Sequence, residues 1–173
     1  MNTKIFPGFK LFLAFVLFAM LSASAYPTER GSVVVEAAGV TIGKGHVALN
    51  LKFWNCTDKA ITLDHRFLPW GQMATGLIVY KGAGVGKELQ ASYPINDLAP
   101  RDVTVSSGGY VTGTLNLDET YPVLKDAKHL DDLVVFWVYD AKVTGILSAG
   151  KFGGMVPLSS TPSTSDRSTV ACR

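Results

Sequence analysis

Short runs of β-branched and aromatic residues, separated by turn-forming residues, recur along most of this chain. In the clearest run, 46–55, alternate positions are apolar: Val47, Leu49, Leu51 and Phe53. Asn50 and Lys52 between them are polar. This alternation has the two-residue period of a β-strand with one face on a core. No apolar pattern at helical spacing persists for three turns, so the chain predicts an all-β fold.

Similar runs predict the other strands, at 33–40, 60–63, 76–80, 103–105, 110–117, 133–139 and 151–158. Clusters of Gly, Pro, Asn and Asp separate them, as turns require. About seven short strands in one domain favour an antiparallel two-sheet immunoglobulin-like sandwich, and a small β-barrel is the alternative. The stretch 118–132 is predicted to be a connection with at most a helical turn at 123–130.

The run 133–139 differs from the others because it is apolar at every position up to Tyr139. Two structures fit such a run. It is either a central strand covered on both faces, or a strand whose outward aromatic residues meet a partner.

The N-terminal residues have the pattern of a signal peptide. Lys4 and Lys10 precede an apolar run, and Ala23-Ser24-Ala25 follows it as a small-x-small cleavage site. The apolar run is about half of the roughly 20 residues that a membrane-spanning helix needs, so cleavage before Tyr26 is favoured over an uncleaved anchor. We expect an exported protein, periplasmic or secreted, with no membrane span after cleavage. Its predicted parts are a signal peptide (1–25), a sandwich domain (26–158) and a flexible tail rich in Ser and Thr (159–173).

Charge argues against nucleic acid as a partner. Two of the 16 basic residues lie in the leader, which leaves 14 basic residues against 14 acidic ones. The mature chain has no basic surplus and no run of Lys and Arg, which are the electrostatic signs of a nucleic-acid-binding protein.

Both cysteines, Cys56 and Cys172, lie in the part that is predicted to enter an oxidising compartment. A pair in that setting favours a disulfide, which would tie the tail to the domain. The alternative is a buried free Cys56 and an unpaired Cys172 in a loose tail.

Motifs for catalysis or cofactor binding are weak or missing. The glycines at 82–86 precede Lys87, but Glu88 takes the place where a phosphate-binding loop needs Ser or Thr. The three histidines, His46, His65 and His129, lie in separate segments without metal-ligand spacing. We therefore expect no enzymatic activity, no cofactor and no metal site.

The order of several features resembles a known family. These features are the strand that runs into 55–63, then 66–69, the strand 77–80, the turn 98–100 and the strand that leads into 116–121. Together they resemble the non-catalytic β-sandwich domain of deuterolysin-type metalloendopeptidases, over roughly residues 32–158. The His-Glu-x-x-His helix that such a protease needs for zinc does not occur in this chain. The resemblance thus implies a stand-alone relative of an accessory domain, without proteolytic residues.

Two tryptophans and an arginine are the candidate contact residues. Trp54 lies on the opposite parity from the apolar series 47–53, and Trp70 lies in the loop 64–76 together with Arg66. Either tryptophan is a binding anchor or a cap at the end of the sandwich core.

The leading functional hypothesis is an exported, non-catalytic module that binds another exported or envelope protein, with an extracellular protease as one candidate. A carbohydrate-binding module that uses an exposed tryptophan is the first alternative. A structural envelope protein is the second.

Overall fold

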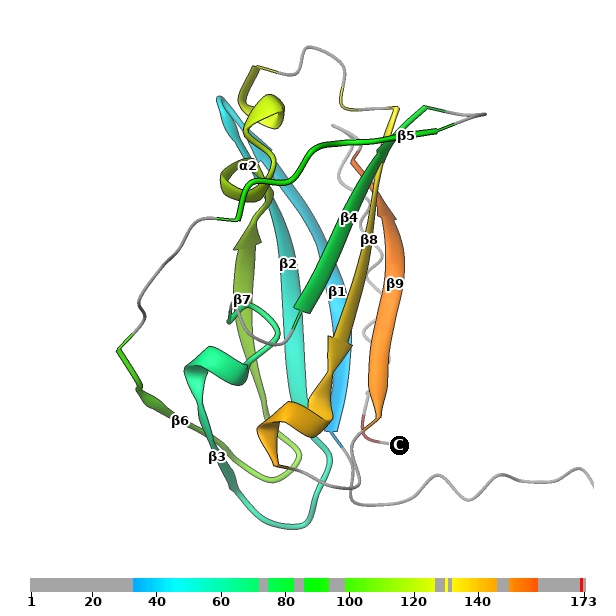
Figure 1. The fold of residues 1–173 in the computed structure, drawn as a ribbon. Coiled ribbons are helices and arrows are strands. Elements are labelled where there is room, and N and C mark those ends of the chain that lie inside the picture. The colour runs from blue at the N-terminus through cyan, green and yellow to red at the C-terminus, as the bar shows by residue number, and fades with distance from the viewer. Residues whose placement is uncertain are drawn as a thin grey trace, which may run out of the picture.

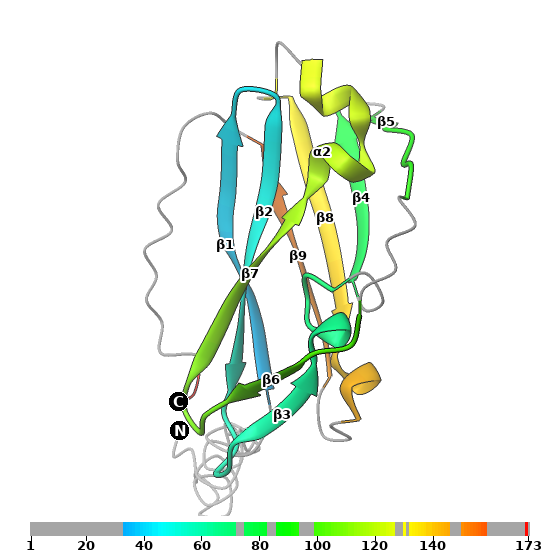
Figure 2. The ribbon, with the colours of Figure 1, turned by 90° about the vertical axis from the view of Figure 1, so that its left-hand side faces the viewer.

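The computed structural model describes residues 33–71, 75–82, 86–93, 99–126, 130, 132–145, 150–158 and 172. The predicted signal peptide 1–25, His129 and the predicted tail apart from Cys172 lie outside these residues. Within them the chain forms two antiparallel sheets that pack face to face, with a short two-stranded extension at one end (Figures 1 and 2).

The first sheet has the order β1-β2-β7. Its strands are β1 (Val33–Gly43), β2 (His46–Asn55) and β7 (Tyr110–Asn116). The register of β1 against β2 shifts between Ala37 and Gly39, which is a β-bulge. Gly39 has a φ of 115°, a backbone conformation that favours glycine.

The second sheet has the order β5-β4-β8-β9. Its strands are β4 (Thr75–Lys81), β5 (Lys87–Glu88), β8 (Leu133–Asp140) and β9 (Lys151–Pro157). The central strand is β8, since it pairs with β4 on one side and with β9 on the other. At one edge of the sandwich, β9 lies beside β1 of the first sheet (Figure 1).

The two-stranded extension consists of β3 (Ile61–Asp64) and β6 (Asp102–Val105). Since β3 follows β2 and β6 precedes β7, the two strand pairs form one antiparallel ribbon that bends (Figure 2). Asn55 is fully buried at the bend, and its side-chain Nδ2 donates to the carbonyl oxygens of Lys59 at 2.7 Å and Val105 at 2.9 Å. These bonds fix the bend, because a buried amide is costly to leave without partners.

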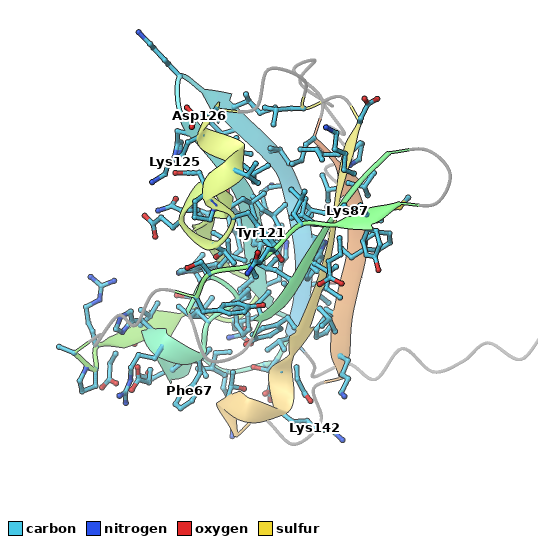
Figure 3. All side chains as sticks on the ribbon, turned by 45° about the horizontal axis from the view of Figure 1, so that its top comes forward. Phe67, Lys87, Tyr121, Lys125, Asp126 and Lys142 are labelled. Carbon is cyan, nitrogen blue, oxygen red and sulfur yellow. A yellow bond between two sulfur atoms is a disulfide. The ribbon has the colours of Figure 1, made fainter. Side chains whose placement is uncertain are left out.

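Short helical turns connect the strands: η1 (His65–Phe67), α2 (Leu117–Thr120), η2 (Pro122–Asp126) and η3 (Ala141–Thr144). The buried Tyr121 lies between α2 and η2, and its hydroxyl donates to the carbonyl oxygen of Leu77 in β4 at 2.9 Å (Figure 3). Among the described residues no helix has the length and apolar character to cross a membrane.

The core lies between the inner faces of the two sheets. Val47, Leu49, Leu51 and Phe53 are all at most 1% exposed, as the alternation in 46–55 predicts. From the opposite sheet, β8 contributes four buried residues: Leu133, Val135, Trp137 and Tyr139. Phe53 and Tyr139 meet across the core with their rings edge to face, 6.4 Å between centroids.

The structure confirms an all-β sandwich and excludes the barrel, because the sheets do not close on each other. The predicted connection 118–132 contains the turn η2 at Pro122–Asp126, which overlaps the expected turn at 123–130, and residues 127–129 lie outside the described ones. The short helix α2 was not predicted and begins at Leu117, the last residue of the strand predicted at 110–117. The strand β5 has only two residues, Lys87 and Glu88, which pair with Lys81 and Tyr80, and it is not among the predicted strands. Two residues are too few to produce a periodic pattern.

Candidate functional site

Cys56 and Cys172 form the predicted disulfide, with their Cα atoms 5.0 Å apart. The bond closes a sequence separation of 116 residues and anchors the C-terminal end of the chain next to the bend at Asn55. In the chain-entropy view a loop of this length stabilises the folded state by roughly 5 kcal/mol. Asn55, which begins the sequon Asn55-Cys56-Thr57, is fully buried and hydrogen-bonded, so it is no acceptor for a glycan in the folded protein.

Trp54 lies on the outer face of the first sheet and is half-buried. Its indole Nε1 donates to Oε1 of Glu36 at 3.0 Å, and its ring tilts against Tyr110 at 4.5 Å between centroids. The ammonium group of Lys52 lies 5.5 Å from the centroid of the Tyr110 ring. Neighbours on β1, β2 and β7 therefore hold this aromatic pair in place, and a contact role for Trp54 stays a prediction.

Arg66 lies in η1, directly after β3, and forms a two-pronged ion pair with Asp64. Its Nε and Nη2 donate to the Asp64 carboxylate, with an Nη2 to Oδ2 distance of 2.6 Å. The backbone N–H of Arg66 donates to the same carboxylate. The side-chain hydrogen bond from Arg66, followed by that backbone bond, lowers the pKa of Asp64. This pair stabilises the turn after β3, and a partner contact by Arg66 also stays a prediction.

Trp70 packs against the core cluster from the loop after η1. Its indole lies directly on the backbone of β7 at Gly113, where an added Cβ would come within 2.0 Å of the ring. Thr75, at the start of β4, donates from its hydroxyl to the carbonyl oxygen of Pro69 at 2.6 Å. Trp70 thus packs against β7 and the core cluster, as a cap would, and a contact role for it stays a prediction.

The three predicted contact residues do not form one site. Trp54 lies on the outer face of the first sheet, Arg66 in η1 beside the extension, and Trp70 against the core. Two histidines are described. His46 begins β2, and its Nδ1 lies 3.1 Å from Oδ1 of the buried Asp118, whereas His65 lies in η1. Within the described part of the chain, no three His, Cys, Asp or Glu side chains gather into a possible metal site.

The outer face of β4, β8 and β9 is a continuous apolar surface that the sequence-based candidates missed. Opposite partners in an antiparallel sheet point to the same side, so the register defines three rows across the strands. The rows are Gly76-Val138-Gly153, Ile78-Phe136-Met155 and Tyr80-Val134-Pro157. We call these nine residues the β4-β8-β9 face.

Four side chains on the β4-β8-β9 face are exposed to an extent that is unusual for their type: Ile78 at 42%, Phe136 at 43%, Val138 at 48% and Met155 at 62%. They are neighbours on adjacent strands rather than scattered residues. Contiguous exposed apolar surface of this kind marks binding sites, whereas isolated apolar residues need no explanation.

Charged groups border the β4-β8-β9 face but do not enter it. Beyond the glycine row, Lys151 and Asp140 form an ion pair at 3.7 Å between Nζ and Oδ2. At the β5 edge, Glu88 lies opposite Tyr80 and continues the Tyr80 row by one charged residue, and Lys87 lies next to it in the β4-β5 hairpin. In Figure 3, Lys87 and Lys142 lie toward opposite ends of this sheet. An apolar centre with a polar rim is the usual anatomy of a protein interface.

One signal in the sequence pointed to this face. The run 133–139 is apolar on both faces, and the structure places it as a central strand with only its inner face buried by the described residues. Phe136 is an outward aromatic residue, as expected for a strand whose outer aromatic residues meet a partner. Met155 gave no such signal, because only the pairing of β9 with β8 brings it beside Phe136.

The buried tyrosines serve the fold. Tyr121 and Tyr139 are each at most 1% exposed and donate to the backbone carbonyl oxygens of Leu77 and Phe67. Burial raises the pKa of Tyr121 to about 12, with smaller effects of Tyr93 and Glu88, and it also raises the pKa of Tyr139. Both phenols remain protonated donors at neutral pH.

Comparison of this chain with protein-family models, curated proteins and solved structures finds no match. The resemblance to the accessory domain of deuterolysin-type proteases therefore stays a prediction.

Proposed function

We propose that this protein is an exported, non-catalytic binding module that recognises another protein through the β4-β8-β9 face. The observation that carries the proposal is the row Ile78-Phe136-Met155, in which three large apolar side chains from three strands are exposed side by side. Burying such side chains in an interface is favourable by about 25 cal/mol for each Å² of apolar surface.

A protein partner accounts for this surface better than a carbohydrate does. Sugar binding needs convergent polar groups together with an accessible aromatic ring, because sugar hydroxyls must keep hydrogen bonds when they leave water. The described side chains at the centre of the β4-β8-β9 face are hydrocarbon or thioether groups. Trp54 is held by Glu36 and Tyr110, and Trp70 covers Gly113, which argues against either tryptophan as a sugar platform.

Export rests on the predicted signal peptide and is compatible with the disulfide between Cys56 and Cys172, since such bonds persist in oxidising compartments. The partner is then an exported or envelope protein. An extracellular protease remains one candidate, because the resembling domains accompany proteases.

The test is a capture experiment with matched variants. The full-length chain with an affinity tag is expressed in the exporting cell with its own N-terminal segment, and proteins that co-purify from envelope and medium are identified by mass spectrometry. Wild type is compared with Met155→Asp and with Val123→Asp, a control at a 56% exposed valine in η2. The proposal expects a protein that wild type and Val123→Asp recover and Met155→Asp does not. An untagged copy of this chain, expressed alongside, is counted among the proteins that can be recovered. Equal recovery of every protein by all three, the untagged copy included, would contradict the proposal.

A further inference from the structure

We propose that the partner of the β4-β8-β9 face is a second copy of this chain, packed face to face about a two-fold axis that runs along the row Ile78-Phe136-Met155. This inference rests on the proposed function and names the partner of the same site. Two-fold dimers use one surface patch on both copies, so the patch has to be complementary to itself.

The relief of the face meets this requirement. The row Tyr80-Val134-Pro157 carries a large side chain at each position, whereas two positions of the row Gly76-Val138-Gly153 have no side chain. A two-fold axis along the middle row exchanges the two outer rows. It places Tyr80 over Gly76 of the second copy and Pro157 over its Gly153. Val134 then meets Val138 in the centre. Tyr80 and Pro157 thus lie over positions without a side chain, and the middle row Ile78-Phe136-Met155 meets the same row of the second copy.

The charges of the face allow the same arrangement. None of its nine residues carries a formal charge, so stacking two copies places no charge among them. Glu88 of β5 flanks the face beside Tyr80, at its edge. At another edge, Lys151 and Asp140 already pair within one copy. The segment 159–171, which follows β9 in the sequence, has Val170 as its single branched aliphatic residue and is otherwise largely Ser and Thr. Its composition does not match an apolar surface.

The size of the face predicts a weak dimer. Strands lie about 4.8 Å apart and residues on one face recur about every 6.8 Å, so three rows on three strands present only a few hundred Å². A stable interface buries roughly 800 Å² per partner. We therefore expect weak, reversible dimerisation, as in other small transient interfaces.

Sedimentation velocity of the purified protein between about 10 µM and 1 mM tests the dimer. The axis runs between the two sheets along the row of Met155, so Met155 of one copy faces Met155 of the other. Met155→Asp and Met155→Lys are each expected to remain monomeric where wild type dimerises, because like charges would meet. An equimolar mixture of the two variants is expected to regain the dimer. Val123→Asp and Val123→Lys serve as controls, and both are expected to dimerise like wild type.

Each other result is decisive. A wild type that is monomeric up to 1 mM overturns the inference. A wild-type dimer without rescue in the mixed sample overturns the proposed axis, because Met155 would then not meet itself. If the wild type is monomeric but Met155→Asp still loses a captured protein that Val123→Asp retains, the binding module stands and only the second copy is excluded. If neither assay depends on Met155, the proposed function fails as well.

Discussion

The two outer faces of this sandwich differ in how their side chains are satisfied. On the outer face of β1, β2 and β7, neighbouring side chains bond to each other: Trp54 to Glu36, Asn50 to Thr41, and Thr114 to Asn50. On the β4-β8-β9 face, the rings of Tyr80 and Phe136 contact each other edge to face, and four apolar side chains remain exposed. On the first face Tyr110 is also exposed, at 52%, but its ring contacts Trp54 and the surrounding side chains bond to each other, whereas the apolar row of the second face gains by contact with another surface.

This difference predicts different consequences of mutation on the two faces. Substitutions on the β1-β2-β7 face should lower the free energy of unfolding, because they break contacts inside the chain. Substitutions on the β4-β8-β9 face should lower binding and leave stability unchanged.

The largest effect is expected from the covalent link that joins the chain end after β9 to the bend of the first sheet. Replacing both cysteines, as Cys56→Ser with Cys172→Ser, should lower the free energy of unfolding by about 2 to 5 kcal/mol, because the unfolded chain loses its long closed loop. Urea denaturation measures this change. Dimerisation of the folded variant should persist. Its loss would mean that the β4-β8-β9 face depends on the disulfide.

A smaller effect is expected at Trp54. Trp54→Ala removes the hydrogen bond to Glu36 and the ring contact with Tyr110, and should lower the free energy of unfolding by about 2 kcal/mol. Trp54→Phe keeps the ring contact and loses only the hydrogen bond, so it should lower the free energy of unfolding by about half as much. Capture and sedimentation of both variants should match wild type. Weaker binding by Trp54→Ala at full folding would place a contact site on the first sheet and break the comparison.

Tyr121 supports β4 from the inside and gives a pH-dependent effect. Tyr121→Phe leaves the Leu77 carbonyl oxygen without its donor and should lower the free energy of unfolding by about 1 kcal/mol at neutral pH. Folding raises the pKa of Tyr121 from 10 to about 12, so its contribution is fully present below pH 10 and is lost as pH rises through 12. Urea denaturation at pH 8 and pH 11 should therefore show a smaller gap between wild type and Tyr121→Phe at the higher pH. A gap that does not change would contradict the raised pKa.

The smallest effect on stability is expected at Met155. Its side chain is 62% exposed, so Met155→Ser should change the free energy of unfolding by less than about 0.5 kcal/mol. Binding through the face should nevertheless fall several-fold. Thermal melts and sedimentation of the same samples measure both quantities. A marked loss of stability would show that Met155 is part of the core, and the contrast between the two faces would then not hold.

Much of the fold follows from local patterns in the sequence. The alternation in 46–55 predicts a strand and also its buried side, because successive side chains of a strand point to opposite faces. The doubly apolar run 133–139 indicated a central strand, and the two cysteines indicated a disulfide from their chemistry alone. The two-residue strand β5 and the four-residue helix α2 were not predicted, since segments this short carry no period.

Tertiary structure alone decided which residues act together. Trp54 and Trp70 look alike as candidates in the sequence, yet one lies on an outer face and the other covers Gly113 in the sandwich. Ile78, Phe136 and Met155 are far apart along the chain and become one row only through the register of β4, β8 and β9. Periodicity is a property of neighbouring residues, whereas register and the uncovered face of a sheet depend on contacts between distant segments.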